Sequence, residues 1–304
     1  MPHHLLSMQA LDFDALTAIL ERAEALRHAG DCRSHLSGRA VCTLFFEPST
    51  RTRLSFQRAA QRLGADILNF EAATSSATKG ETALDTLKNI EAMGVSAFII
   101  RAREDGLVAE FAQSAAPGTA LINAGDGRSQ HPTQALLDML TIREAKGRDF
   151  SALKVAIVGD ILHSRVARSD LAALHTLGVQ DIRVCGPANL LPADDTLAGC
   201  HVSHDLDEAL SDADVVMTLR LQRERMEDGL IESLDGYHRD YGITAARMAG
   251  AARDAIVMHP GPLNRGVEIS DEVADGAQSR ILRQVENGVL VRMAVLERAL
   301  LKLP

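Results

Sequence analysis

Aromatic residues are scarce in this sequence: they make up 3% of its 304 residues, and tryptophan is absent. Few side chains are therefore available to stack on bases or sugars. Basic residues are also in the minority, because 32 lysines and arginines face 41 aspartates and glutamates, for a formal net charge of −9. This balance argues against non-specific binding of nucleic acid, and it gives weight to arginines that gather in one loop.

Cysteines are few and lie far apart in the chain. Cys32, Cys42, Cys185 and Cys200 form no Cys-x-x-Cys pair. The sequence therefore predicts neither a zinc site nor a disulfide framework, and it fits a reducing cytosol.

Targeting and membrane signals are also missing. Residues 1–7 lack the charged and long apolar segments of a signal peptide. No run of about 18 apolar residues suggests a membrane span. We therefore expect a cytoplasmic protein that has no membrane partner.

Strand-like and helix-like segments alternate along the whole chain, which predicts parallel sheets flanked by helices. The length suffices for two α/β domains, and two such units in tandem imply a cleft between them that would hold the active site. The expected strands are 40–46, 66–70, 96–100, 119–123, 154–158, 182–185, 215–219 and 255–258. The expected helices are 7–29, 49–64, 82–93, 107–115, 132–145, 165–177 and 206–210, with one or two more in 279–302.

Residues 45–53 join a buried strand to a helix and predict an anion site. Ser49 is placed to cap the helix, whose first turn offers unpaired N–H groups and the positive end of the helix dipole to a phosphate. Arg51 adds a fixed charge, and the hydroxyls of Ser49, Thr50 and Thr52 can donate hydrogen bonds to phosphate oxygens. The alternative is an ordinary capped helix with surface arginines.

His131 and Gln134 follow the strand 119–123 and lie three residues apart across the first turn of the next helix. Both can therefore point at one ligand. An imidazole polarises a carbonyl oxygen, and an amide can recognise a carbamoyl NH₂ group. Taken alone, His131 would more often be a cap or a surface group.

Arg101 ends another apolar strand, where its guanidinium could reach the same phosphate. Pairing with Glu104 is the alternative. Glu47 lies beside the predicted anion site, where its charge would repel the ligand. We therefore expect Glu47 to orient an arginine.

The second half of the chain also carries basic residues after predicted strands. Gly159 and Asp160 look like the start of a dinucleotide fold, but residues 161–163 stand where further glycines would be needed, so NAD is not expected. Arg220 and Gln222 follow the strand 215–219 and could both face the cleft. The alternative is a solvated run of charges.

A family resemblance emerges from these motifs. Residues 46–53, Phe-Glu-Pro-Ser-Thr-Arg-Thr-Arg, resemble the carbamoyl phosphate signature shared by aspartate and ornithine carbamoyltransferases. The His-Pro-Thr-Gln run at 131–134 is similar to the carbamoyl-binding motif of that family, and residues 163–169 are similar to the segment that binds aspartate. The resemblance extends over nearly the whole chain and points to the aspartate carbamoyltransferase branch.

The resemblance implies a role for each of these positions. Catalytic roles fall on Arg51, Thr52, His131 and Lys79; Lys79, together with Ser75, lies on a loop that reaches into a neighbouring subunit. The implied carbamoyl phosphate-binding residues are Ser49, Thr50, Arg51, Thr52, Arg101, His131, Gln134 and, through backbone carbonyls, Pro260 and Gly261. The implied aspartate-binding residues are Lys79, Arg165, Arg220 and Gln222, of which the two arginines suit two carboxylates.

The implied reaction is transfer of the carbamoyl group of carbamoyl phosphate to the amine of L-aspartate. The products are N-carbamoyl-L-aspartate and phosphate, in pyrimidine synthesis, and no metal or cofactor is expected. Lys79, His131 and the departing phosphate all remain candidates to accept the amine proton. The implied domains are residues 1–132 with 286–304, which bind carbamoyl phosphate, and residues 133–285, which bind aspartate.

The same resemblance implies an assembly. A homotrimer is the expected core, because the loop that carries Lys79 must come from a neighbour. Residues 261–265, Gly-Pro-Leu-Asn-Arg, are nearer to a bacterial subgroup whose trimers associate with dihydroorotase chains. Dihydroorotase or regulatory chains are therefore the candidate partners of a larger assembly.

Two other functions compete with this interpretation. Ornithine carbamoyltransferases would show a cysteine loop in place of residues 259–262 and a Ser-Met-Gly segment near Arg220, and neither is present. A cationic ornithine side chain would also be poorly served by Arg165 together with Arg220. A non-catalytic scaffold would be expected to lose ligand residues, whereas all of them are in place here.

Overall fold

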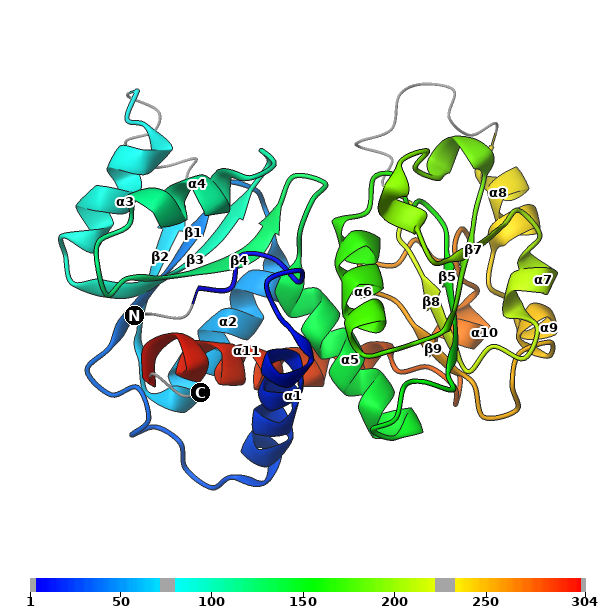
Figure 1. Cartoon of the computed structure of the whole chain (residues 1–304), viewed down its shortest axis with the longest axis horizontal. Helices are drawn as coiled ribbons and strands as arrows, with labels where there is room; N and C mark the ends of the chain where they lie inside the picture. Colours follow the sequence, from blue (N-terminus) through cyan, green and yellow to red (C-terminus); the bar gives the residue numbers. More distant parts are fainter. Residues whose placement is uncertain (1–3, 72–79, 222–232, 302–304) are drawn as a thin grey trace. The chain divides into compact units, whose positions relative to one another are not determined.

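The computed structural model describes residues 4–71, 80–221 and 233–301 (Figure 1). Contacts between residues divide the chain into two compact units. The first comprises Met1–Leu140 and Val285–Pro304, and the second comprises Thr141–Gln284.

The first unit is built on a four-stranded parallel sheet in the order β2-β1-β3-β4. Its strands are β1 (Ala40–Phe45), β2 (Asp66–Glu71), β3 (Val95–Ala102) and β4 (Ala120–Asp126). Strands β1, β3 and β4 are buried almost throughout. A sheet that is covered by helices on both faces buries the side chains on both faces of its strands. The strands are therefore continuous apolar runs in the sequence.

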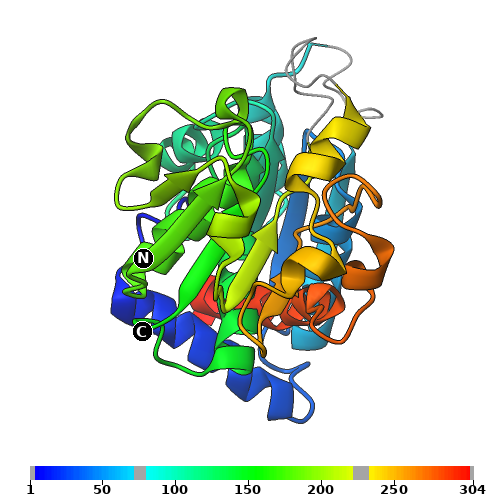
Figure 2. The ribbon, with the colours of Figure 1, turned by 90° about the vertical axis from the view of Figure 1, so that its right-hand side faces the viewer.

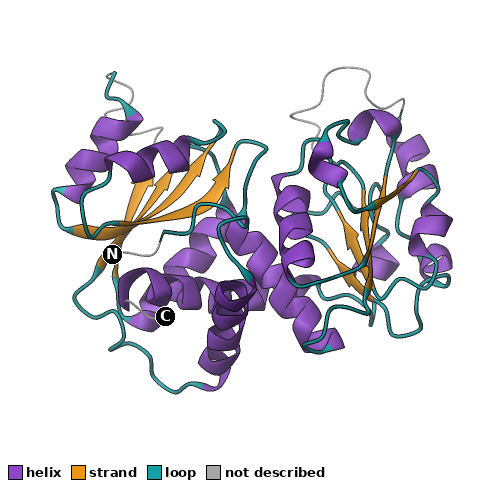
Figure 3. Ribbon diagram, viewed as in Figure 1, coloured by secondary structure: helices purple, strands orange, loops and turns teal. Residues whose placement is uncertain are grey.

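Helices cover both faces of this sheet (Figures 1 and 3). On one face, α3 (Ala83–Glu91) and α4 (Leu107–Ser114) bury Leu87 and Phe111 against Leu44 and Phe98 of the strands. The other face is covered by α1 (Phe13–His28), α2 (Thr50–Leu63) and α11 (Ile281–Leu301). The first part of α5 (Pro132–Lys146) also belongs to this unit.

The second unit holds a five-stranded parallel sheet in the order β7-β6-β5-β8-β9, seen in Figure 2. Its strands are β5 (Lys154–Val158), β6 (Asp181–Cys185), β7 (His201–Ser203), β8 (Val215–Thr218) and β9 (Ile256–Met258). One face is covered by α6 (Arg165–Thr176). Against the other pack α7 (Leu206–Leu210), α9 (Ala245–Met248) and α10 (Asp271–Ala274), and α8 (Leu234–Tyr241) adds a smaller cluster around Tyr237.

The predicted fold class, two parallel sheets flanked by helices, is confirmed. Most predicted ends differ from the observed ones by no more than about two residues, but two differ by more. The opening helix begins at Phe13 rather than at Ser7, because Asp12 caps it by accepting from Ala15 N–H. Before it, Leu5 pairs with β4: Leu5 N–H donates to Leu121 O at 2.9 Å, and Leu5 O accepts from Asn123 N–H at 2.8 Å. Strand β4 continues to Asp126, because a register shift in β3 lets Ala102 pair with Asp126.

Within the described ranges, none of the helices combines the length and the apolar character that crossing a membrane requires.

Candidate active site

The predicted anion site lies at the switch point of the first sheet. From β1 the chain passes to β2 on one side, then crosses to β3 on the other side of β1 and continues to β4. The direction of winding therefore reverses between β1 and β3. Ligands of open α/β sheets bind outside the carboxyl ends of the strands at such a point. Residues 46–49 leave the carboxyl end of β1, and Arg101 lies near the carboxyl end of β3. The two sequence-predicted segments therefore flank this position.

Arg101 is held in place by its strand pairing and by three hydrogen bonds. It pairs with Phe45 across the strands, and its backbone carbonyl accepts from Phe46 N–H at 2.8 Å. Its Nη2 donates to Glu47 Oε1 at 2.8 Å, and its Nη1 donates to Ala124 O at 3.1 Å. Both charged side chains are 12% exposed. The prediction that Glu47 orients an arginine is confirmed, and that arginine is Arg101.

The start of α2 differs from those of its neighbours. Ser49 is the N-cap residue, as predicted, but its side chain makes no capping hydrogen bond, whereas Asp12 and Thr82 cap α1 and α3. The N–H groups of the first turn are therefore not satisfied by the cap side chain, which favours an anion site over an ordinary capped helix. Thr52 is buried in this turn, while Thr50 and Arg51 are exposed.

His131 and Gln134 are both buried, with 5% and 8% of their surface exposed. The alternative that His131 is a surface group is therefore wrong. α5 begins directly after His131, whose carbonyl accepts from Gln134 N–H at 2.9 Å. The side-chain Nε2 of Gln134 donates to both oxygens of Asp138, at 3.1 and 3.2 Å.

The loop that leads to His131 is pinned to the end of β3. Gly127 N–H donates to Ala102 O at 3.2 Å, and Arg128 N–H donates to Asp105 Oδ1 at 2.8 Å. Gly127 has φ +46°, and an added Cβ would lie 2.0 Å from Asp105 Oδ1. A glycine is therefore needed for this close approach.

The second sheet repeats the arrangement, because its winding reverses between β5 and β8. After β5, Asp160 Oδ1 accepts from His163 N–H at 3.1 Å and contacts His163 Nδ1 at 2.8 Å. Ser164 then caps α6 through Ala167 N–H, and Arg165, 5% exposed, is the first residue of that helix. Arg220 is partly buried and lies just beyond β8. Arg165 and Arg220 thus follow the two strands that flank the second switch point.

A third loop, after β9, carries Pro260 and Gly261. Gly261 N–H donates to His259 Nδ1 at 2.7 Å, so the other ring nitrogen of His259 carries a proton and donates to Glu268 Oε1 at 3.0 Å. The same oxygen accepts from Asn264 N–H at 2.6 Å, and Glu268 is fully buried. These contacts fix the backbone at Pro260 and Gly261, whose carbonyls are predicted to hold the carbamoyl group.

Two supporting carboxylates, Asp138 and Glu268, were missed by the sequence reasoning. Each interrupts an apolar run, in Leu136-Leu137-Asp138-Met139-Leu140 and in Val267-Glu268-Ile269. A charge in such a run is a usable signal, because a buried carboxylate must be hydrogen-bonded or paired. Of the predicted site residues, Ser75, Lys79 and Gln222 lie outside the described residues.

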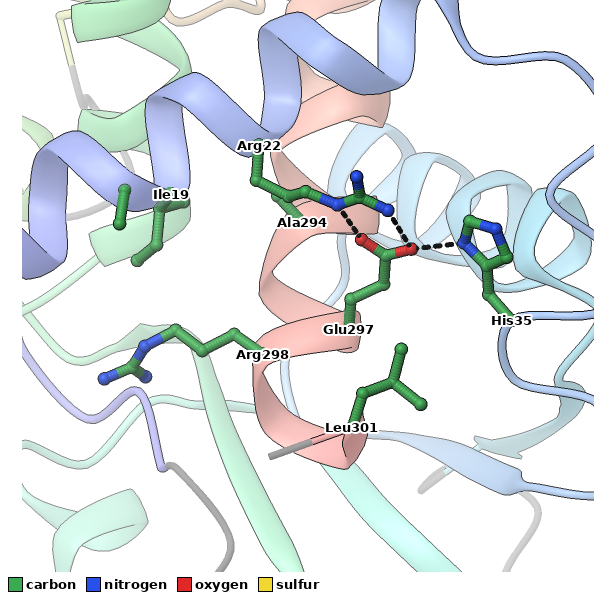
Figure 4. A pocket seen from close by; sticks show the side chains of 8 residues that line it. Ile19, Arg22, His35, Ala294, Glu297, Arg298 and Leu301 are labelled. Carbon is green, nitrogen blue, oxygen red and sulfur yellow. Dashed lines mark hydrogen bonds and ion pairs between the residues drawn. The ribbon is translucent and has the colours of Figure 1, made fainter. Parts of the chain in front are cut away.

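A separate cavity of about 510 Å³ lies between α1 and α11 (Figure 4). At its side, Arg22 and His35 both point at the fully buried carboxylate of Glu297, with Arg22 Nε at 2.6 Å from Oε2 and His35 Nδ1 at 2.5 Å from Oε1. Its lining is Ala18, Ile19, Arg22, His35, Ala294, Glu297, Arg298 and Leu301. None of these is a predicted site residue, and the buried charge has its own partners, so the cluster serves the packing of α1 on α11.

Family models match both halves of the chain. The carbamoyl-P binding domain of aspartate/ornithine carbamoyltransferase matches residues 3–144, and the Asp/Orn binding domain of the same family matches residues 151–299. The chain belongs to the aspartate/ornithine carbamoyltransferase family. The first family domain contains the whole four-stranded sheet, and the second contains the whole five-stranded sheet.

Similar members of the carbamoyltransferase family are known. The aspartate carbamoyltransferase catalytic subunit of Xanthomonas campestris pv. campestris (strain B100) is 66% identical over 301 residues, which are 98% of this chain and 96% of that protein. That of Stenotrophomonas maltophilia (strain K279a) is 64% identical over 302 residues, with the same coverage. A crystal structure of aspartate transcarbamoylase from Trypanosoma cruzi, in complex with carbamoyl phosphate and aspartate, superposes with a TM-score of 0.89 at 32% identity and covers 98% of this chain and 97% of that one.

Proposed function

We propose that this chain transfers the carbamoyl group of carbamoyl phosphate to the amine of L-aspartate, which gives N-carbamoyl-L-aspartate and phosphate. The observation that carries the proposal is the position of Arg165 at the start of α6, the helix that follows β5, and of Arg220 just beyond β8. Two guanidinium groups suit the two carboxylates of aspartate, whereas ornithine has one carboxylate and a cationic side chain. The relatives at 64–66% identity are aspartate carbamoyltransferase catalytic subunits, and the Trypanosoma protein was crystallised with carbamoyl phosphate and aspartate.

In this proposal carbamoyl phosphate is bound by residues of the first unit, together with Pro260 and Gly261 of the second. The start of α2 and the guanidinium groups of Arg51 and Arg101 hold the phosphate, with hydroxyl hydrogen bonds from Ser49, Thr50 and Thr52. The amide of Gln134 and the backbone carbonyls of Pro260 and Gly261 hold the carbamoyl NH₂ group. Arg165, Arg220, Gln222 and Lys79 hold aspartate.

The reaction begins when the unprotonated amine of aspartate attacks the carbonyl carbon. Arg51, Thr52 and His131 stabilise the charge that develops on the carbonyl oxygen. The amine proton passes to Lys79, His131 or the departing phosphate. The bond from the carbonyl carbon to the bridging oxygen then breaks, and Arg51, Arg101 and the N-terminus of α2 stabilise the charge on the departing phosphate. Most of the rate enhancement comes from positioning and from charges that are already oriented before the reaction.

Product formation tests this function directly. The purified protein is given carbamoyl phosphate with either L-aspartate or L-ornithine, and the ureido product is measured colorimetrically. We expect product with aspartate alone. Product with ornithine alone would show that the assignment of Arg165 and Arg220 is wrong, and no product with either, even after addition of a candidate partner chain, would favour a scaffold.

The proposed domains are residues 1–132 with 286–304, which bind carbamoyl phosphate, and residues 133–285, which bind aspartate. Family models with these two descriptions match residues 3–144 and 151–299, which supports the order of the domains. The boundary in α5 is the least constrained, because the compact units divide at Leu140 rather than at residue 132. Limited proteolysis that released a stable fragment ending far from this helix would contradict the assignment.

We further propose a cytoplasmic homotrimer in which Ser75 and Lys79 act in the neighbouring active site. Dihydroorotase or regulatory chains are the partners proposed for a larger assembly. Because each site then needs two subunits, we expect specific activity to fall as dilution dissociates the trimer, in parallel with the mass measured by mass photometry. A monomer that kept full activity at high dilution would overturn the shared site, and recovery of the protein outside the cytoplasm would contradict its location.

A further inference from the structure

Asp138 fixes which end of the Gln134 amide faces a ligand. It lies one helical turn after Gln134 on α5 and is fully buried. Both of its oxygens lie within hydrogen-bond distance of Gln134 Nε2, at 3.1 and 3.2 Å. A carboxylate only accepts hydrogen bonds, so it can bind only the NH₂ end of the amide. The carbonyl end, Oε1, is therefore directed away from Asp138 and is presented as an acceptor.

A buried cation from another helix supports the charge on Asp138. Arg292 of α11 is buried, with its guanidinium carbon 5.1 Å from the centre of the Phe56 ring on α2. Burial lowers the pKa of Arg292 to about 10, while the charge of Asp138 acts in the opposite direction. Arg292 thus stays a cation at neutral pH, and its charge and that of Asp138 attract each other.

Gly288 makes the room for this guanidinium. An added Cβ at Gly288 would lie 2.5 Å from Arg292 Nη1 and 3.2 Å from Leu137 Cδ2. α11 therefore approaches α5 closely at this point, and the space that a side chain would fill is taken by the guanidinium. The guanidinium of Arg292 therefore belongs to the packing of the two helices.

We propose that Asp138 is a positioning residue that holds the Gln134 amide with Oε1 as the acceptor, so that the site selects a carbamoyl NH₂ over a methyl group of the same size. This inference rests on the proposed function, in which Gln134 contacts the carbamoyl group. Acetyl phosphate carries CH₃ where carbamoyl phosphate carries NH₂. With acetyl phosphate bound, Gln134 Oε1 would face a methyl group and lose its hydrogen bond. A site that leaves a buried polar group unpaired in this way discriminates strongly against the substrate that lacks the donor.

The test compares kcat/KM for carbamoyl phosphate and acetyl phosphate in wild type and in Asp138→Asn. Asparagine offers an acceptor and a donor at the same place, so the Gln134 amide can adopt both orientations, one of which turns its NH₂ towards the substrate NH₂. We expect kcat/KM for carbamoyl phosphate to fall at least about twofold, because only part of the Gln134 amides then present Oε1 to the substrate, while that for acetyl phosphate barely changes, so that the ratio of the two falls by the same factor. A parallel loss with both substrates would show a merely structural role and overturn the inference.

Two further variants sharpen the test. Thr141→Val changes another buried polar residue of α5 and should leave the substrate ratio unchanged. Asp138→Asn combined with Arg292→Met removes both buried charges together, so it remains informative if the single variant fails to fold, and it should show the same lowered ratio. An unchanged ratio in a folded variant overturns this inference alone, whereas a wild type that makes no product with aspartate overturns the proposed function as well.

Discussion

Arg51→Ala will lower kcat by roughly 10²-fold or more, in line with the loss of one oriented charge from an oxyanion site. Arg51 is exposed and lies in the first turn of α2, where the Ser49 side chain makes no capping hydrogen bond to the backbone N–H groups. Negative charge develops first on the carbonyl oxygen and then on the departing phosphate, and Arg51 is assigned to both. Its removal is therefore felt in the transition state more than in the bound substrate.

The measurement is steady-state kcat at saturating concentrations of both substrates, so that weakened binding does not obscure it. Arg58→Ala is the matched control, because Arg58 is an exposed arginine further along the same helix and should leave kcat within about twofold. Arg51→Lys keeps the charge without the planar fork and should recover only part of the loss. Turnover of Arg51→Ala near the wild-type value would contradict the assigned role.

The predicted part of this site rests on local signals. An apolar run, a cap residue and Gly64 lie close together in the sequence, and they place the strand, the turn and the helix without reference to the rest of the chain. Gly64 does end α2 in the left-handed conformation, with φ +78°. The position of Arg101 was also readable, because it ends an apolar strand, and the alternation of elements predicts parallel pairing.

The missing part depends on partners that are far apart in the sequence. The backbone of Leu5 forms hydrogen bonds with Leu121 and Asn123, and no sequence pattern within residues 4–8 predicts this contact. The local spacing of apolar residues predicts a helix from Ser7, because that spacing contains no information about this pairing. Contacts within the sheet decide the strand register and the long-range pairing, and they override the local secondary-structure propensity of the residues.

Buried charges pose the same difficulty. The composition shows that Asp138, Arg292 and Glu297 exist, but not that they are buried. Arg22 and Glu297 are 275 positions apart, so their ion pair follows only from the packing of α1 on α11. The sequence offers only a weaker signal. A charged residue within an apolar run indicates a buried charge, and a buried charge requires a hydrogen-bonded or oppositely charged partner.

Arg165→Ala will lower kcat/KM for aspartate by roughly 10²- to 10⁴-fold, because a bidentate arginine donates two charge-assisted hydrogen bonds to a carboxylate, each of about 1.5–3 kcal/mol. Arg165 is 5% exposed, at the start of a helix that Ser164 caps, so its guanidinium stem is fixed before aspartate arrives. Burial also weakens the competition from water, which makes each hydrogen bond count for more. The loss should appear mainly in KM for aspartate, since the bond to its carboxylate exists in both the bound substrate and the transition state.

The affinity for carbamoyl phosphate separates this role from general damage. Arg165 lies in the Asp/Orn binding domain, so calorimetric Kd for carbamoyl phosphate should stay within about twofold of wild type. Arg168→Ala is the control on the same helix, because the Arg168 guanidinium already donates to Thr196 Oγ1. We expect Arg168→Ala to change KM for aspartate by less than about threefold. If instead Arg168→Ala caused the larger loss, the carboxylate site would lie one helical turn further along α6, and the assignment to Arg165 would be wrong.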